Sequence, residues 1–262
     1  MNAFSKTIIA ASIAAATVFS GTAAAQSTSF NEFTVKPVGD YANFVADKIT
    51  GNYTETAVFN PNGTFNVNLV WTAGQFVGDG GNRAYSSFDT GLGSTYSLYA
   101  NYAASGTYSV TGTTTTFTFA PGTGSLNLFL DTAPRAAGGE VLLGSGSPEA
   151  GEGTLNPMLS TCKSPNNPNG KGINCGSFGA SSTFALTEAG STFFILPNPF
   201  YSMTFQSGQL NNFTPSGTQT INGSLDVVFD NSAEVPEPAS VGLLGLGMLG
   251  LYAARRRNKK AA

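Results

Sequence analysis

Histidine is absent from the 262-residue sequence, and only two cysteines and one tryptophan are present. Without an imidazole, Ser-His-Asp and Cys-His nucleophile activation and HExxH zinc sites are excluded. Charged residues are also scarce, at 10% of the chain. The many glycines occur in turn contexts rather than in a phosphate-binding loop between a strand and a helix. We therefore expect a protein that is not an enzyme and has no catalytic residue, no metal and no cofactor.

Aspartate and glutamate leave one kind of chemistry available. Glycoside hydrolysis needs only a pair of carboxylates, and the chain has 15 acidic residues. These residues are scattered along the sequence, and none stands in a recognisable catalytic motif. An extracellular glycosidase is therefore the least favoured of the functions considered below.

The N-terminal segment has the three regions of a cleavable signal peptide. An apolar run at residues 7–19 follows a positively charged start, and the small residues Ala23 and Ala25 precede Gln26. The run is too short to span a bilayer. The pattern predicts a signal peptide at residues 1–25 that is removed before Gln26. The alternative is a short buried helix at the edge of a domain.

The C-terminal segment predicts a short membrane anchor. Pro236, Glu237 and Pro238 interrupt any preceding strand, because neither proline can donate a backbone hydrogen bond. Residues 239–254 carry no charge, and as a transmembrane helix they would extend about 24 Å. A basic cluster follows, made of Arg255, Arg256, Arg257, Lys259 and Lys260. Because positive charge stays on the cytoplasmic side, everything before the prolines should lie outside.

Between the two ends we expect an acidic ectodomain, residues 26–234. From Gln26 to Pro238 the chain has 6 basic and 15 acidic residues, a net charge of −9, whereas the whole chain carries −3. Nucleic acid and anionic membrane are poor partners for such a surface. Frequent Phe and Tyr, together with abundant Thr, Ser, Gly and Asn, favour an extracellular β-protein over a disordered chain.

Apolar and polar residues alternate with a period of two along this ectodomain. Residues 54–59 and 65–71 flank the turn Asn60-Pro61-Asn62-Gly63, which predicts a β-hairpin. The alternation recurs at residues 96–102, 117–119, 126–130, 184–186, 193–196, 201–205 and 221–229. Short strands spaced in this way predict an all-β fold, an antiparallel β-sandwich or a barrel-like domain. Residues 41–49 alone indicate a short helix.

Residues 133–179 form a Gly/Pro/Ser-rich region that we expect to be a loop. Cys162 and Cys175 lie within it and bracket a turn-forming segment. Outside the cytoplasm, two isolated cysteines favour a disulfide, which would stabilise the fold by roughly 3 kcal/mol. A catalytic thiol or a metal pair is the alternative, and the absence of histidine disfavours it. The pattern is equally compatible with a binding loop and with a tolerated insertion.

Aromatic side chains on a hydroxyl-rich sheet suggest contact with carbohydrate. The candidates are Trp71, Tyr96, Tyr99 and Tyr102. Alternating aromatics more often belong to the core, and the strand pattern favours that interpretation for Trp71. Tyr99 must face opposite Tyr96 and Tyr102, so one of these two sets should be exposed.

The C-terminal pattern resembles the PEP-CTERM sorting signal of Gram-negative bacteria. Val-Pro-Glu-Pro, a glycine- and leucine-rich segment and Arg-Arg-Arg follow one another within residues 235–260. The resemblance implies that an exosortase, a membrane-embedded processing enzyme, recognises Pro236, Glu237 and Pro238. The chain would then be anchored in the inner membrane before processing and pass to the cell surface or extracellular matrix afterwards.

The ectodomain is also similar to the flocculation-associated PEP-CTERM proteins. Residues 30–35, 46–53, 71–76 and 222–229 carry this resemblance. It implies a role in flocculation or biofilm formation through association with exopolysaccharide, and it transfers no catalytic residue. The alternative is an adhesin-like surface protein whose partner is another protein.

Overall fold

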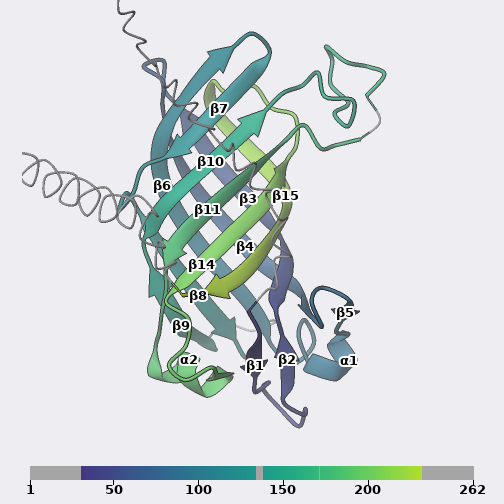
Figure 1. Ribbon diagram of the computed structural model, residues 1–262, viewed down its shortest axis with the longest axis vertical. Helices are drawn as coiled ribbons and strands as arrows, with labels where there is room; N and C mark the ends of the chain where they lie inside the picture. Colours follow the sequence, from purple (N-terminus) through teal and green to yellow (C-terminus); the bar gives the residue numbers. More distant parts are fainter. Residues whose placement is uncertain (1–30, 134–137, 171, 232–262) are drawn as a thin grey trace, which may run out of the picture.

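The computed structural model describes residues 31–133, 138–170 and 172–231. These residues form an antiparallel barrel of eight strands, with 61% strand and 5% helix (Figure 1). The all-β prediction is confirmed, and of its two alternatives the barrel is correct. The predicted signal peptide, sorting motif and transmembrane helix lie outside the described residues. Within the described ranges, no helix has both the length and the hydropathy that crossing a membrane requires.

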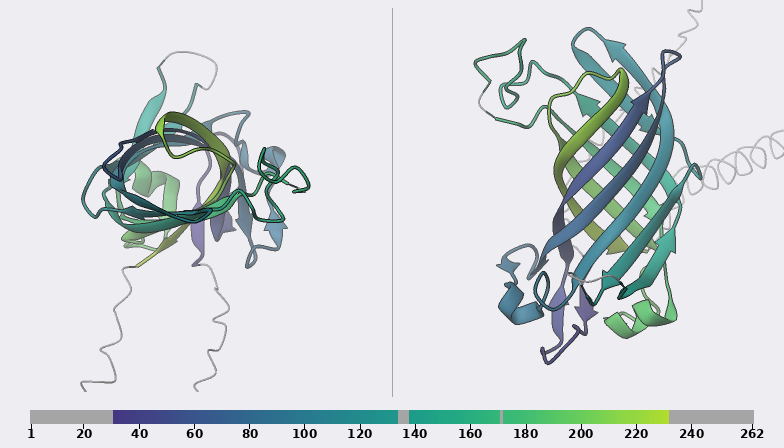
Figure 2. Two further views of the ribbon diagram at one scale, coloured as in Figure 1. Left: turned by 90° about the horizontal axis from the view of Figure 1, so that it is seen from above. Right: turned by 180° about the vertical axis from the view of Figure 1, so that it is seen from behind.

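Strands that are neighbours in the wall are also neighbours along the chain. Five positions in the wall are single strands: β3 (Lys48–Phe59), β4 (Thr64–Gly78), β6 (Ser97–Thr111), β14 (Met203–Leu210) and β15 (Gly217–Asp230). Antiparallel pairing of β15 with β3 closes the ring, which the view from above in Figure 2 shows. This arrangement is an up-and-down barrel, a closed sheet in which each long strand pairs on both sides.

Each of the other three positions is shared by two strands that lie end to end. They are β7 (Thr114–Phe119) with β8 (Ser125–Asp131), β9 (Glu140–Gly146) with β10 (Pro148–Leu155), and β11 (Gly176–Thr183) with β12 (Ala185–Leu186). β6 pairs with β7 along one half and with β8 along the other. The wall is therefore continuous although these strands are interrupted.

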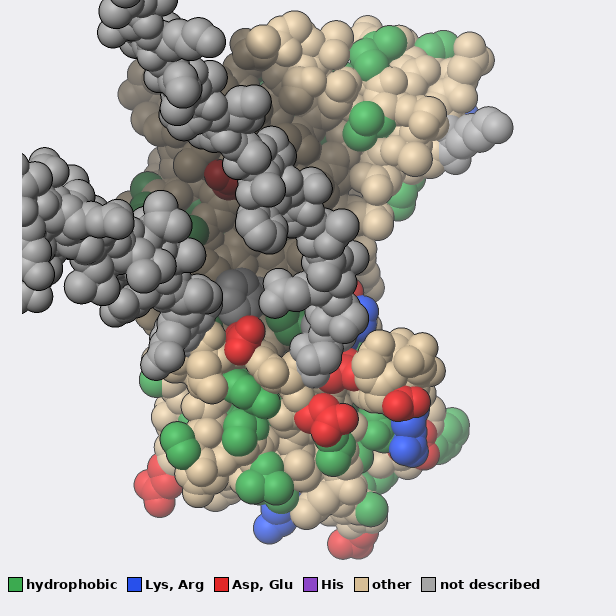
Figure 3. Space-filling model, viewed as in Figure 1, with side chains coloured by type: hydrophobic (Ala, Val, Ile, Leu, Met, Phe, Trp, Pro, Cys, Tyr) green, Lys and Arg blue, Asp and Glu red, His purple; other side chains and the backbone are tan. Residues whose placement is uncertain are grey.

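Alternation along the strands separates the inside of the barrel from the outside. In β4, Phe65, Val67, Leu69 and Trp71 are buried, as predicted from their spacing. Hydroxyl and amide side chains cover the outer face, among them Thr54, Thr56, Asn66, Asn68, Thr72, Asn101, Thr116, Thr118 and Asn222. The predicted hairpin is also confirmed, because β3 and β4 pair from Phe59↔Phe65 onward. In Figure 3, charged side chains on the face in view gather toward the lower end of the molecule.

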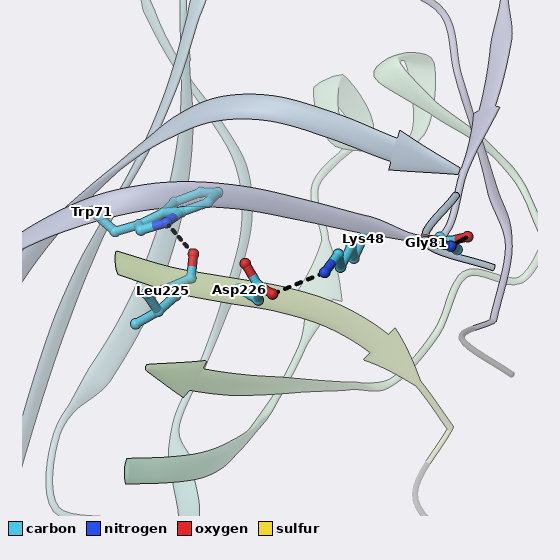
Figure 4. A network of polar contacts seen from close by, with 6 residues as sticks. Lys48, Trp71, Gly81, Leu225 and Asp226 are labelled. Carbon is cyan, nitrogen blue, oxygen red and sulfur yellow. Dashed lines mark hydrogen bonds and ion pairs between the residues drawn. The ribbon is translucent and has the colours of Figure 1, made fainter. Parts of the chain in front are cut away.

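Inward glycines make room for large aromatic rings. The indole of Trp71 lies across β3 at Gly51 and donates a hydrogen bond of 3.1 Å to the carbonyl of Leu225 in β15 (Figure 4). Tyr53 uses the same device: its ring lies over Gly223, and its hydroxyl donates to the carbonyl of Gln209 at 3.0 Å. A Cβ at either glycine would overlap the ring, so the rings can pack here only because both positions are glycine.

The lower end of the barrel in Figure 1 is closed by small elements. A three-stranded sheet has the order β13 (Phe194–Leu196), β1 (Phe33–Val35) and β2 (Phe44–Ala46). The helices α1 (Ser87–Thr90) and α2 (Glu188–Phe193) and the short strand β5 (Arg83–Ala84) lie at the same end. Phe229 of β15 contacts Phe33, Phe194 and Phe200 with ring centroids 5.1 to 5.6 Å apart. This aromatic cluster forms the floor of the barrel.

The helix predicted at residues 41–49 is wrong. Phe44–Ala46 is strand β2, and β3 begins at Lys48. β2 forms antiparallel pairs with β1, and the ring of Phe44 packs edge-on against Phe76 at 5.0 Å. A segment this short takes its conformation from such tertiary partners rather than from local propensity.

The loop expected at residues 133–179 is wrong for most of its first half. Strands β9 and β10 occupy Glu140–Leu155 apart from Ser147. Two of their glycines face aromatic rings: a Cβ at Gly144 in β9 would meet the ring of Phe184, and one at Gly151 in β10 would meet the ring of Phe119. The residues that indicated turns are thus the ones that let neighbouring rings pack against the wall.

The predicted disulfide between Cys162 and Cys175 is confirmed, and both residues are fully buried. It closes the irregular segment that follows β10 and leads into β11. The backbone N–H of Cys175 donates to the carbonyl of Leu210 at 2.8 Å, which ties the segment to the upper end of β14. The loop prediction therefore holds for the part that contains the cysteines.

Replacing Gly51 with alanine should destabilise the barrel, because the added Cβ would overlap the Trp71 ring and the Thr72 carbonyl. We expect Gly51→Ala to lower the free energy of unfolding by roughly 1–3 kcal/mol. Gly74→Ala is the matched control in β4, since the nearest atom to its Cβ would be 3.7 Å away. Urea unfolding of both variants checks this, and equal midpoints would contradict it.

Candidate functional site

The four aromatic candidates divide between the two faces of the barrel wall. Trp71, Tyr96 and Tyr102 point inward and are 2%, 0% and 9% exposed, so they belong to the core. Tyr99 faces outward from β6 and is partly exposed. The expected opposition between Tyr99 and the other two tyrosines is confirmed, and Tyr99 alone remains available to an external ligand.

Tyr99 is one half of an outer aromatic pair, which we define as Tyr99 and Phe129. Phe129 lies opposite Tyr99 on β8, with the ring centroids 5.1 Å apart and the ring planes at 14°. Leu142 of β9 continues the row beyond Phe129, and Thr72 of β4 continues it beyond Tyr99. The sequence contained the signal for Phe129, since it alternates with the inward Leu128 and Leu130.

Polar groups border the outer aromatic pair. Two residues along the same strands, Asn101 faces Asn127 on the outer side of the wall. Partial burial, together with the nearby carboxylates of Glu140 and Asp131, raises the pKa of Tyr99 to about 12. The Tyr99 hydroxyl therefore stays protonated at neutral pH. An apolar ridge flanked by amides, a hydroxyl and carboxylates can contact the face of a sugar ring and hydrogen-bond its hydroxyls.

A second polar group lies inside the barrel, around Glu55. This residue occupies an inward position of β3, between the buried Tyr53 and Ala57. Burial raises the pKa of the Glu55 carboxyl to about 7. Burial also raises the pKa of Tyr53 and of Tyr102, and the charge of Glu55 adds to both shifts. Tyr53 is the neighbouring inward residue on β3, and Tyr102 lines the same cavity as Glu55.

Sequence reasoning missed Glu55, although the signal was present. Tyr53, Glu55, Ala57 and Phe59 share one face of the strand, so a carboxylate stands among core residues. A cavity in the barrel interior lies beside Glu55. Among the described residues that line this cavity, Glu55 is the one carboxylate. Glycoside hydrolysis requires two. In the described part of the chain, no group of three or more His, Cys, Asp or Glu could hold a metal ion.

Comparison with known proteins concerns the C-terminal segment. A family model described as the PEP-CTERM protein-sorting motif matches residues 234–257. No curated protein and no solved structure matches the chain. The motif indicates an exported protein that is held in the membrane and then processed by an exosortase. The match covers the sorting segment and does not extend into the barrel.

The predicted sorting residues fall inside the matched range and outside the described structure. They are Pro236, Glu237 and Pro238, followed by the basic residues Arg255, Arg256 and Arg257. The predicted signal-peptide cleavage at Ala23, Ala25 and Gln26 also lies outside the described residues and stays a prediction.

Replacing Glu237 tests recognition by the exosortase. We expect Glu237→Ala to leave a larger species in the membrane fraction, because the motif would no longer be processed. Glu149→Ala, at an exposed position of β10, is the matched control and should be processed normally. Immunoblots of membrane and extracellular fractions measure both, and normal processing of Glu237→Ala would contradict the assignment.

Glu55 should make stability depend on pH. The pKa of its carboxyl rises from 4.5 to about 7 on folding, so the folded chain keeps a proton that the unfolded chain releases. The free energy of unfolding should therefore be highest below pH 4.5 and fall by about 3 kcal/mol as pH rises through 7. Glu55→Gln should remove this fall, while Glu152→Gln, at an exposed position, should keep it. Urea titrations across this range measure it, and parallel curves for all three proteins would contradict it.

Proposed function

We propose that the processed barrel is a non-catalytic component of the cell surface or extracellular matrix that promotes flocculation by contacting exopolysaccharide. The observation that carries this proposal is the outer aromatic pair, which lies on a wall covered by hydroxyl and amide side chains. Such a surface offers an apolar contact and many hydrogen-bonding groups with few charges, which suits sugar rings. The PEP-CTERM motif, which indicates an exported protein, supports the location.

The negative charge of the ectodomain constrains the charge of the polysaccharide that it can bind. A net charge of −9 over residues 26–238 repels acidic polymers at low salt. We therefore infer that the partner carries little negative charge. Binding should depend weakly on ionic strength, because stacking and neutral hydrogen bonds are screened little by salt.

An adhesin-like role with a protein partner is the second candidate. Exposed apolar residues at the two ends of the barrel favour it, namely Phe88 of α1, which is 91% exposed, and Ile173 of the disulfide loop, which is 74% exposed. These residues lie apart from the outer aromatic pair, so the two functions can be tested separately.

Removing the outer aromatic pair should weaken binding to polysaccharide. For the double variant Tyr99→Ala/Phe129→Ala we expect at least a tenfold loss of affinity, about 1.4 kcal/mol. Phe88→Ala is the matched control, since it removes an exposed ring from another part of the molecule. The measurement is cosedimentation of the exported protein with the polysaccharide of its own cells.

Two results would contradict the proposal. Equal cosedimentation of the double variant and of wild type would show that the outer aromatic pair does not contact the polysaccharide. Unchanged floc formation after deletion of the gene would show that the protein does not promote aggregation. If polysaccharide binding is absent but Phe88→Ala abolishes cell aggregation, the protein-partner function replaces it.

A further inference from the structure

The interior of the barrel is incompletely filled. A cavity beside Glu55 offers about 40 Å³ to the centres of water molecules, and an adjoining cavity toward the upper end offers about 30 Å³. One water requires roughly 10–15 Å³ measured in this way, so the pair exceeds the space of a single water. The two cavities share the lining residues Glu55, Val67, Phe119 and Phe178, so they adjoin each other. Eight-stranded barrels are wide enough to hold one small ligand.

Most of the lining is apolar, but a few polar atoms in it have no partner. The Tyr102 hydroxyl and Gln206 Oε1 form no hydrogen bond with any described residue, and their side chains are 9% and 8% exposed. The Gln206 amide is held by a 2.7 Å hydrogen bond from its Nε2 to the Thr204 hydroxyl, which leaves Oε1 as the unpartnered acceptor. Buried polar atoms usually have a partner, so these two atoms are free to form a hydrogen bond with a polar group that enters the cavity.

Among the described residues that line the two cavities, the ionisable side chains include an acid, Glu55, and no base, since neither lysine nor arginine is present. A buried carboxylate without a cation is costly. An anionic ligand would increase that cost, whereas the attraction of an ammonium group would offset part of it. A hydrocarbon body then fits the apolar remainder of the lining, which includes Leu128, Phe184 and Leu225.

We propose that the barrel interior binds a small apolar amine, whose ammonium group pairs with Glu55 beside the Tyr102 hydroxyl while its hydrocarbon body lies among the apolar side chains below. The site is distinct from the outer aromatic pair and does not rest on the polysaccharide function. Tyr99→Ala/Phe129→Ala should therefore bind the amine as wild type does.

We expect a ligand to enter the cavity from the upper end. The floor is closed by the cluster around Phe229, whereas the upper cavity ends at Phe213, in the connection between β14 and β15. Phe213 is partly buried and stacks on Phe59 at 5.7 Å and on Phe117 at 6.0 Å. A ring carried by a loop can swing aside more readily than one carried by the wall, so Phe213→Ala should accelerate binding.

Three probes with the same six-carbon chain test the chemistry: hexylamine, hexanol and hexanoate. The protein is recovered from outside cells that express the full chain, and binding is measured by isothermal titration calorimetry. We expect hexylamine to bind at least tenfold more tightly than hexanol, and hexanoate not to bind. Glu55→Gln should weaken hexylamine at least tenfold and leave hexanol unchanged, whereas the exposed control Glu152→Gln should change neither. Equal binding of hexanoate, or an unaffected Glu55→Gln, would overturn the proposal.

The pH dependence gives an independent readout. Because the pKa of Glu55 is about 7 and an ammonium requires its ionised form, hexylamine affinity should be constant above this pH and fall up to tenfold per unit below it. The other titratable groups facing Glu55 are Tyr53 on β3 and Tyr102 on β6, and burial raises the pKa of both, so they stay neutral in this range. A pH-independent affinity would contradict pairing with Glu55.

A second variant keeps the test decisive if Glu55→Gln does not fold. Ala180 lines the cavity and is buried, so Ala180→Leu should fill the space and abolish binding of hexylamine and hexanol alike. Persistent binding to a folded Ala180→Leu would place the amine outside the barrel and overturn the proposal.

Discussion

The structure depends on large aromatic rings that lie against inward glycines. A closed ring of eight strands encloses a narrow interior, and side chains from all its positions compete for that space. Trp71 and Tyr53 are too long to point straight at the axis, so each lies over a glycine of the next strand, Gly51 and Gly223. Each then hydrogen-bonds to a backbone carbonyl one strand further along. These contacts link three neighbouring strands at once.

The same packing explains where the interior remains open. Rings fill the two ends, through the cluster around Phe229 at the floor and through Phe59, Phe117 and Phe213 at the upper end. Between them aliphatic side chains such as Val67, Ala100 and Ala180 alternate with rings and leave space in the lining, and this is where Glu55 is buried. Side chains on the outer surface do not pack in the core, so this surface can carry amides and hydroxyls with Tyr99 and Phe129 among them.

Prediction from the sequence succeeded where the signal was local. Alternation with a period of two predicted the faces of β4, β6, β8 and β15, and Asn60-Pro61-Asn62-Gly63 predicted the turn of the first hairpin. The presence of two isolated cysteines and the expected compartment predicted the disulfide. Prediction failed at residues 41–49 and at β9 and β10, where pairing with other strands decides the conformation. Glycines in β10 were interpreted as turns because the rings that they accommodate are far away in the sequence.

The sequence by itself determined the all-β class, the inward and outward residues of the long strands, the disulfide and the sorting motif. Each of these depends on the identity and spacing of residues within a short segment. Only the tertiary structure decided between sandwich and barrel, because that choice depends on whether β15 pairs with β3 across more than 150 residues of chain. The same closure buries Glu55 beside Tyr102 and pairs Tyr99 with Phe129 on the outside. A carboxylate in a strand becomes a buried charge only when the ring of strands closes around it.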